Sequence, residues 1–299
     1  MVVAAVVIRQ ALDDDSNDPG RRGDGAAVLV CAADLRDLCN ALSGIEVRSQ
    51  TAADTASAID DGTLAEDIDG WITTTAWVEV VDSRSPDVLA DAEALATSPA
   101  VVATAPGRFE AINDLCDGND VWVCLGGAAG ADWADLGDGS HPDWGELKVG
   151  LTAPDSAMGL SVLASASAGF FGSTTFATND FSELEGWLST LAVPSAAGDP
   201  DPARTLATRQ GAYSAAGAVA AVAGRFDARG VQAIEPQTAV AATVVLVGLD
   251  GGDGLPEVDP VRDALVDDGW SRASEDDLAP TLKPGVMAAL HTLWRAVTS

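Results

Sequence analysis

Apolar residues along this chain follow two patterns that alternate from one segment to the next. In one pattern they stand together in short runs, as at 26–31 (AAVLVC), 99–103 and 239–249, which is typical of buried strands. In the other they recur every three or four positions, as at 35–42, which is typical of a helix packed by one face. The alternation of the two predicts an α/β chain with a mostly parallel sheet.

The first third of the chain is predicted to begin with an exposed loop, because residues 11–25 are charged and rich in Gly and Asp. Asp34 stands where it could cap the helix that follows the first strand. The further elements expected here are a strand at 44–48, a helix at 51–59, a strand-like stretch at 68–81, a helix at 87–95 and a strand at 99–103.

The remainder of the chain is predicted to be looser in the middle and more regular toward its end. No internal repeat is visible. The expected elements are a loop at 126–142, a strand at 147–151, helices at 153–171 and 181–191, a loop at 193–203, an Ala-rich helix at 213–226, strands at 231–235 and 239–249, and helices at 260–268 and 282–297.

Charge restricts the partners that this chain can have. Its 299 residues include 16 Lys and Arg but 46 Asp and Glu, which gives a formal net charge of −30. A polyanion repels phosphate backbones, so neither nucleic-acid binding nor docking to anionic membranes is expected. Hydrophobic residues nevertheless make up 47% of the chain, and we therefore expect a packed core.

The apolar runs leave the cellular compartment open. The longest, at 239–249, is far too short to span a bilayer, and the run at 2–8 is not preceded by the basic segment of a signal peptide. One alternative is a cytoplasmic protein. The other is a chain cut just after a signal or membrane anchor.

Four cysteines favour the second alternative. Cys31 and Cys39 are eight residues apart, as are Cys116 and Cys124, and no pair has the C-x-x-C spacing. With two His in the chain, a zinc site is not expected. Two local disulfides, Cys31–Cys39 and Cys116–Cys124, are the favoured pairing in an oxidising compartment. Four buried free thiols, and the other two connectivities, stay open.

Four segments, in order, carry a resemblance to a known family. They are 28–35 (VLVCAADL), 94–102 (ALATSPAVV), 148–160 (KVGLTAPDSAMGL) and 261–270 (VRDALVDDGW). Together they resemble extracellular solute-binding proteins with the type II periplasmic-binding fold. The chain looks most similar to the molybdate-type branch and to the solute-binding-like domains that accompany von Willebrand factor A domains.

The resemblance implies an α/β fold with two lobes, each a mostly parallel sheet flanked by helices. The chain would leave the first lobe near Ser98 and return near Gln237, so these passages should be neighbouring strands with a ligand cleft between the lobes. The implied bounds are 26–103 plus 238–299 for lobe I, 104–237 for lobe II and 1–25 for an N-terminal extension.

The resemblance also implies which residues face the cleft. Ser156 and Ala157 begin a helix whose unpaired N–H groups could bind an oxyanion or a carboxylate, although an ordinary helix cap would look the same. The first-loop Ser of the family is replaced here by Cys31 or Ala32. The ligand-binding residues expected from the resemblance are Ala32, Ala33, Thr74, Ser98, Ser156, Ala157 and Tyr213.

Three of these residues have equally plain structural interpretations. Thr74 is a normal strand residue, and Ser98 suits the extended turn that precedes a proline. Tyr213, the single Tyr of the chain, could be a packing residue.

Catalytic chemistry is not indicated. The chain has no G-x-S-x-G, no P-loop Lys and no H-E-x-x-H. Asp13-x-Asp15-x-Asn17 begins like a calcium loop, but Asp18 replaces the Gly that such a loop needs. We therefore expect no enzyme, no cofactor and no metal site.

The sequence thus predicts an extracytoplasmic solute-binding protein that captures a small molecule of unknown class. We expect a monomer, membrane-anchored in its full-length form, with a membrane transporter or another envelope protein as partner. The alternative is an interaction domain that keeps this fold but has lost its ligand. The missing first-loop Ser and the acidic surface favour that alternative.

Overall fold

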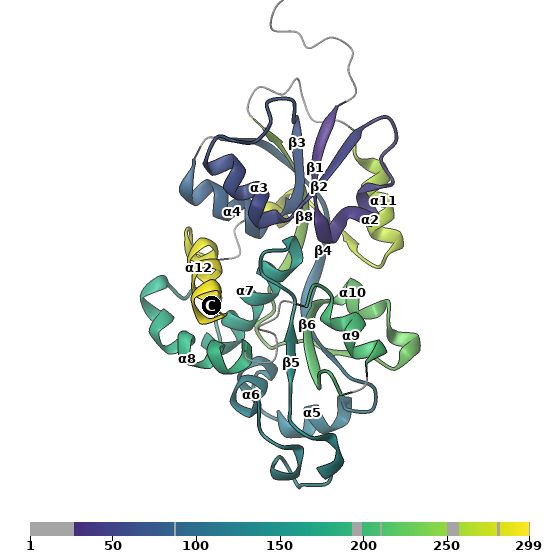
Figure 1. The fold of residues 1–299 in the computed structure, drawn as a ribbon, viewed down its shortest axis with the longest axis vertical. Helices are drawn as coiled ribbons and strands as arrows, with labels where there is room; N and C mark the ends of the chain where they lie inside the picture. Colours follow the sequence, from purple (N-terminus) through teal and green to yellow (C-terminus); the bar gives the residue numbers. More distant parts are fainter. Residues whose placement is uncertain are drawn as a thin grey trace, which may run out of the picture.

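Two α/β halves, called here the first and second lobes, are joined by strands that run from one into the other (Figure 1). The computed structural model describes residues 27–86, 88–192, 199–209, 211–249, 257–279 and 282–298. The loop predicted at 11–25 and the extension at 1–25 lie outside the described residues. The strand order is β2 (Glu46–Gln50), β1 (Val28–Ala32), β3 (Gly70–Thr74), β8 (Ala241–Leu249), β4 (Leu89–Thr104), β6 (Ala215–Val219) and β5 (Val149–Leu151), while β7 (Gln232–Ile234) and β9 (Ser271–Arg272) pair with β4.

The first lobe is built on β1, β2 and β3, in which β1 runs parallel to both of its neighbours. All five residues of β1 are buried, because helices cover both faces of the sheet, and this explains its continuous apolar sequence. The helices of this lobe are α2 (Arg36–Cys39), α3 (Ala52–Asp60), α4 (Thr75–Arg84) and α11 (Asp259–Asp267).

The two passages between the lobes are neighbouring strands, as expected from the sequence. β4 and β8 are antiparallel, with Ser98 opposite Ala242 and Pro99 opposite Ala241. From Ala100 onward, β4 pairs with β6 of the second lobe instead. The 16-residue β4 therefore belongs to both lobes, and the chain crosses between them at Pro99.

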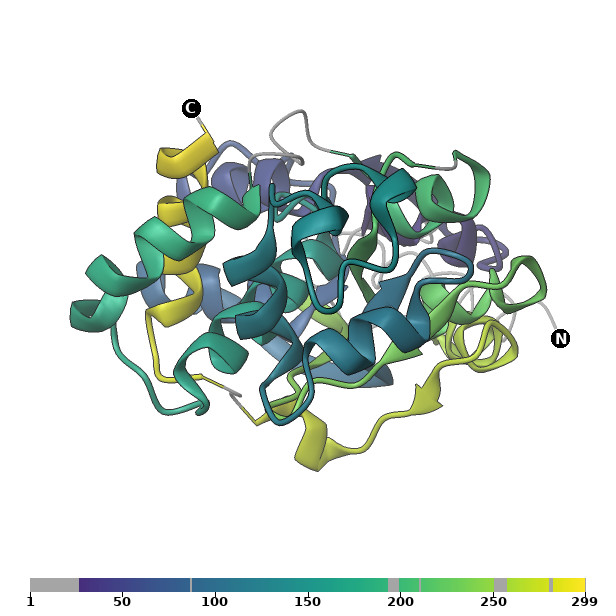
Figure 2. The ribbon, with the colours of Figure 1, turned by 90° about the horizontal axis from the view of Figure 1, so that it is seen from below.

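The second lobe is built on β4, β6 and β5, and every residue of β5 and β6 is buried. Its helices are α5 (Phe109–Leu115), α6 (Val121–Ala128), α7 (Ala157–Phe171), α8 (Phe181–Ala192), α9 (Pro202–Thr208) and α10 (Ala220–Gly224). The last helix, α12 (Val286–Thr298), lies beside α8 of this lobe (Figure 2) and also packs on α4 of the first. The end of the chain was expected in the first lobe, whereas α12 lies along both.

Three predicted elements take another form. Residues 68–81, expected as a strand, form β3 and then α4, and residues 87–95, expected as a helix, belong largely to β4. Residues 213–226, expected as an Ala-rich helix, contain β6 and the short α10. Ala favours a helix in isolation, but the small residues of β6 leave room for α7 above the sheet, so packing outweighs propensity there.

The sheet is more mixed than the mostly parallel one expected. The pairs β1–β2, β1–β3 and β5–β6 are parallel, whereas β3–β8, β8–β4 and β4–β6 are antiparallel. The reason is the crossing itself. β4 leaves the first lobe and β8 returns to it, so the two strands run in opposite directions. Each lobe therefore contains at least one antiparallel strand pair.

Both favoured disulfides are present, which contradicts the alternative of four free thiols. Cys31 is bonded to Cys39 and Cys116 to Cys124. The first bond joins β1 to the end of α2 and closes the loop that follows the first strand. The second joins the end of α5 to α6 in the other lobe.

Gly217 of β6 lies where side chains of α6 and α7 pack directly on the sheet. A Cβ atom there would stand 2.6 Å from Val162 Cγ1 and 2.8 Å from Trp122 Cη2, and both side chains are buried. We expect Gly217→Ala to lower the free energy of unfolding by about 1–3 kcal/mol, because the helices must move outward.

The matched control is Gly127→Ala, at an exposed position of α6 with no atom within 4 Å of an added Cβ. It should leave the free energy of unfolding unchanged or raise it by up to about 1 kcal/mol, since Ala favours a helix over Gly. Denaturant unfolding measures both variants. Equal stabilities would contradict the packing described here.

Candidate functional site

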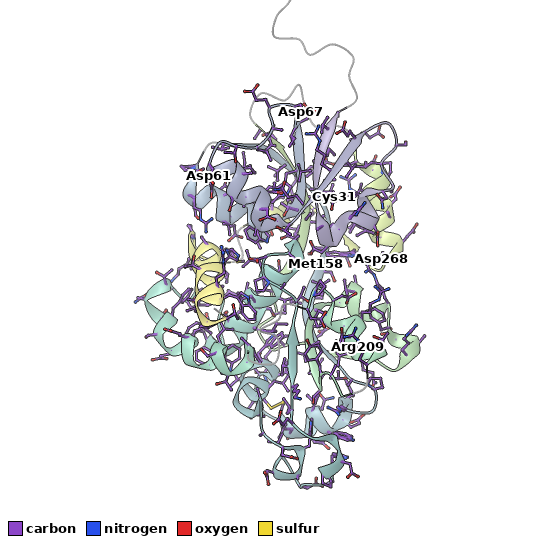
Figure 3. All side chains as sticks on the ribbon, in the orientation of Figure 1. Cys31, Asp61, Asp67, Met158, Arg209 and Asp268 are labelled. Carbon is purple, nitrogen blue, oxygen red and sulfur yellow. A yellow bond between two sulfur atoms is a disulfide. The ribbon has the colours of Figure 1, made fainter. Side chains whose placement is uncertain are left out.

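A cleft of about 360 Å³ lies between the two lobes. In the first lobe its walls follow the carboxyl ends of β1 and β2, and in the second they follow the carboxyl ends of β5 and β6. Ligands of open α/β sheets bind outside this end of the strands. The first lobe contributes Ala33, Asp34, Asp37 and Thr51, and the second contributes the loop before α7, the start of α9 and the β6–α10 turn. Figure 3 labels Met158 of α7 between the lobes, below Cys31.

The first-lobe wall of the cleft is a short loop held at both ends. Residues 33–35 form one turn of 3₁₀ helix directly after β1, and α2 follows at once. Leu35 is buried in the core, and Cys39 is bonded back to Cys31. The backbone on both sides of Asp34 is therefore held in place, and its side chain extends from that backbone.

The second-lobe wall is the N-terminus of α7, and it is bound by the carboxylate of Asp34. Ala157 N–H donates to Asp34 Oδ1 over 3.1 Å, and Met158 N–H donates to Asp34 Oδ2 over 2.9 Å. Gly159 N–H donates to the capping Ser156 Oγ over 3.0 Å. First-turn N–H groups have no partner within the helix and carry the positive end of its dipole. The position predicted for a ligand oxyanion is thus filled by a side chain of the first lobe.

Three further hydrogen bonds attach the same turn to the first lobe. The carbonyl groups of residues 155–157 accept, in order, the backbone N–H of Ala53 over 3.1 Å, the indole N–H of Trp77 over 2.8 Å and the hydroxyl of Thr74 over 2.8 Å. These donors come from α3, α4 and the end of β3. The start of α7 is therefore in direct contact with three elements of the opposite lobe.

Asp34 combines burial with strong hydrogen bonding. Burial raises the pKa of Asp34, and the N–H groups of Met158 and Ala157 act in the opposite direction. The carboxylate exchanges water for two backbone donors and the dipole of a long helix. These hydrogen bonds offset the free-energy cost of removing the carboxylate from water when the cleft closes.

Asp155 makes a second polar contact, with the C-terminal helix. Its Oδ1 lies 2.6 Å from His291 Nε2, and the imidazole packs edge-on against Trp77 with ring centroids 4.9 Å apart. The hydrogen bond from His291 lowers the pKa of Asp155. The Asp155 side chain is 56% exposed and that of His291 only 8%. α12 is thereby attached to the segment that leads into α7.

The cleft is predominantly acidic. Arg225 is paired with Asp268, so its charge is already balanced. Asp37 is exposed and has no hydrogen-bond or ion-pair partner among the residues that the structure describes. The charged residues that line the cleft are Asp34, Asp37, Asp155, Asp201 and Arg225.

Ala33 and Ser156, both predicted to bind ligand, line the cleft. Ala32 and Ala157 are fully buried next to them, and Ala157 takes part through its backbone groups. Thr74 is also fully buried, and its hydroxyl is used by α7 rather than offered to a solute. The predicted residues are therefore brought together, but mostly as structure around the cleft.

Ser98 has a structural role at the crossing. It is 2% exposed, and its Oγ accepts the N–H of Ala221 over 3.1 Å, which satisfies a donor in the first turn of α10. The hydroxyl is thus engaged within the protein and does not line the cleft.

Tyr213 does not line the cleft, although its ring lies close to Pro202, which follows the cleft-lining Pro200 and Asp201. It precedes β6, whereas the cleft is reached at the other end of that strand, at Val219. Its ring packs on Gly150 of β5. The expected helix at 213–226 would begin at Tyr213, whereas in the structure Tyr213 precedes the strand β6.

The acidic residues of the cleft carry little sequence signal. Asp34 was expected to cap its own helix, and instead it caps α7, more than a hundred positions later. Asp37 and Asp201 cannot be distinguished by pattern in a chain that has 46 Asp and Glu.

No group of three or more His, Cys, Asp or Glu that could hold a metal ion occurs within the described ranges. Among those same residues, no helix has both the length and the apolar character needed to cross a membrane.

Known proteins resemble this chain in structure rather than in sequence. No family model and no curated protein matches it. The ferric binding protein from Campylobacter jejuni is similar, with a TM-score of 0.57 and 13% identity over 91% of this chain and 99% of that one. Iron-bound HitA from Pseudomonas aeruginosa gives 0.52 and 14% over 91% and 99%. The periplasmic binding protein AfuA from Actinobacillus pleuropneumoniae, with exogenous fructose-6-phosphate bound, gives 0.50 and 12% over 93% and 84%.

These similarities confirm the fold predicted from the sequence. The chain has the two-lobed α/β fold of periplasmic solute-binding proteins over almost its whole length. At such low identities the likeness concerns the fold alone. The finer resemblance to the molybdate-type branch stays a prediction.

The role of Ser98 can be tested by removing its hydroxyl. Ser98→Ala leaves the buried N–H of Ala221 without a partner, so we expect a loss of about 1–3 kcal/mol in the free energy of unfolding. The control is Ser167→Ala in α7, where the buried hydroxyl donates to a helix carbonyl and its removal orphans no N–H group. Urea unfolding compares the two, and a Ser98→Ala variant no less stable than Ser167→Ala would argue against this role.

The pair formed by Asp155 and His291 predicts a pH dependence. A carboxylate with a lowered pKa stabilises the fold at pH values above the ordinary Asp pKa of about 3.9, and this contribution is lost as pH falls through the lowered value. Asp155→Asn should therefore cost stability at neutral pH and progressively less in acid. Because Asp155 is more than half exposed, the cost should be about 1 kcal/mol or less.

Denaturant unfolding at several pH values between neutral and acid checks this dependence. Asp54→Asn, which changes an exposed carboxylate of α3 near the same pocket, is the control. A difference between wild type and Asp155→Asn that does not change with pH would contradict the expectation.

Proposed function

We propose that this chain captures a small solute in the cleft between its lobes, as an extracytoplasmic solute-binding protein. The observation that supports this most strongly is the cleft of about 360 Å³, lined from both lobes at the carboxyl ends of their strands. A cavity of that volume suits a small molecule. Among proteins of similar fold, AfuA is one with a sugar phosphate bound.

Movement of the lobes would provide the binding step. We take the lobes to be residues 26–103 with 238–299 and residues 104–237, which β4 and β8 connect, and α12 at the end of the first set packs on both. Two neighbouring strands can absorb a rotation over a few residues near Pro99 and Val240. A solute that touches both walls binds the closed form more tightly and therefore shifts the population toward it.

The charge of the cleft favours a neutral or positively charged solute. Asp37 has no ion-pair partner within the described part of the chain, and Arg225, the cation among the described lining residues, is already paired with Asp268. The net charge of −30 also slows the arrival of anions. Met158, Val219 and Val222 supply apolar surface for the body of a solute. Small amines, betaines and sugars fit this chemistry better than oxyanions.

The two disulfides support a place outside the cytoplasm, because such bonds persist in oxidising compartments. The partner that we propose is a membrane transporter that receives the solute when the lobes open.

A thermal-shift screen sorted by charge tests the ligand class. Its three sets are amines and betaines, neutral sugars and polyols, and oxyanions such as sulfate and molybdate, all at one ionic strength. We expect a hit in one of the first two sets, with a rise in Tm on the order of 5 °C at a hundredfold excess over Kd, and none among the oxyanions.

Two tryptophan variants locate the binding of any hit. Ala33→Trp fills the cleft from an exposed lining position and should abolish the shift. Ala41→Trp adds the same side chain at an exposed position of the same lobe outside the cleft and should retain it. A shift that survives in Ala33→Trp would contradict this site. Silence from all three sets would favour the ligand-free interaction domain.

A further inference from the structure

The Asp34 carboxylate is bound in the way that a ligand anion would be. Both of its oxygens are used, one by Ala157 N–H and one by Met158 N–H, at the start of a 15-residue helix. Two adjacent N–H groups and the helix dipole form a common binding arrangement for carboxylates and other oxyanions. In this protein the anion is supplied by the chain itself.

The contact joins the lobes. Asp34 belongs to the turn after β1 in the first lobe, and α7 extends from β5 into the core of the second. The neighbouring bonds from Trp77 and Thr74 engage carbonyl groups of the same turn. Asp34 is the one partner of this turn that brings a negative charge to the positive end of the helix.

The Cys31–Cys39 bond closes the loop that carries Asp34. In this loop Asp34 lies between two buried residues, Cys31 and Cys39. Closing a loop of this size removes freedom mainly from states in which the loop is disordered. The same loop supplies Ala33 and Asp37 to the cleft.

We propose that Asp34 is a built-in occupant of the anion position at α7, that it holds the two lobes together when no solute is bound, and that the Cys31–Cys39 disulfide fixes the loop that presents it. The lobes then close without a ligand anion, and a solute that touches both walls further stabilises a closed form that Asp34 already favours. A solute binds beside Asp34 rather than in its place, and small anions enter this position only when the Asp34 side chain leaves it. We call the contact of Asp34 with the N–H groups of Ala157 and Met158 the clasp. It does not depend on the identity of the solute proposed above.

Removal and replacement of the carboxylate test the clasp. Asp34→Ala leaves a space at the two N–H groups that formate fits. We expect the Tm of this variant to fall on the order of 5 °C below wild type and its small-angle scattering profile to become more extended. Formate, exchanged against chloride at constant ionic strength, should restore a large part of both changes in a saturable manner and should not affect wild type.

Three controls make the result specific. Asp61→Ala removes an exposed carboxylate elsewhere in the first lobe (Figure 3) and should show neither opening nor an effect of formate. Benzoate has the same charge as formate but is too large for the space, so it should not rescue Asp34→Ala. Asp34→Asn keeps the shape and leaves no space, so it should open the lobes without rescue by formate. If Asp34→Ala does not fold, Asp34→Asn still reports the opening.

The disulfide is tested with a matched pair. Cys31→Ala/Cys39→Ala and Cys116→Ala/Cys124→Ala each remove one bond of the same spacing, in opposite lobes. Both should lower Tm, but only the first should produce the extended scattering profile. Adding Asp34→Ala to the first pair should then change the profile little, because the clasp is already released.

Scattering profiles of Asp34→Ala and Asp34→Asn that match Asp61→Ala, together with no effect of formate, would overturn the clasp. Equal opening of both disulfide variants would overturn the role of Cys31–Cys39. No solute takes part in these measurements. Rescue by formate without any hit in the solute screen would therefore support the clasp and contradict the proposed function. A hit in the solute screen without rescue by formate would support the proposed function and contradict the clasp.

Discussion

The first turn of α7 has N–H groups that the helix cannot satisfy internally, and the structure satisfies them from the opposite lobe. This requirement brings Asp34 into contact with the start of α7, which lies far away in sequence. The loop after β1 must reach the loop after β5, so the two sheets must meet at the carboxyl ends of their strands. The crossing of β4 and β8 places them there, because both strands pass between the lobes side by side.

The same contact links the fold to the chemistry of the cleft. A protein with a net charge of −30 has little use for a free anion site, since its own field opposes the arrival of anions. Filling the helix N-terminus with Asp34 removes that site and leaves an acidic, partly apolar space beside it. The disulfide that closes the Asp34 loop and the C-terminal helix attached through His291 both stabilise this arrangement.

The sequence predicted those parts of the fold that rest on local patterns. The apolar run of β1 and both disulfides depend on short segments whose neighbours in sequence are also neighbours in space. The crossing near Ser98 was implied by the family resemblance, since β4 and β8 pair across a large sequence separation. The Ala-rich β6 and the first half of β4 were mistaken for helices, because their strand form is decided by pairing with distant strands.

The candidate site was predicted in the same uneven way. The start of α7 was found, because Pro154 and Ser156 mark a helix N-terminus in sequence. Its partner Asp34 was not, because a contact across 123 positions leaves no local pattern and the chain has many other carboxylates. Tyr213, expected to begin a helix at the cleft, instead precedes β6 and is absent from the cleft lining.

Amide hydrogen exchange at Ala157 and Met158 in the solute-free protein tests the central claim most directly. First-turn amides of a helix normally exchange rapidly, because they lack partners within the helix. The account predicts that these two amides are protected as strongly as those in the following turn of α7. Exchange at the rate of unbonded amides would show that Asp34 does not hold the lobes together, and would contradict it.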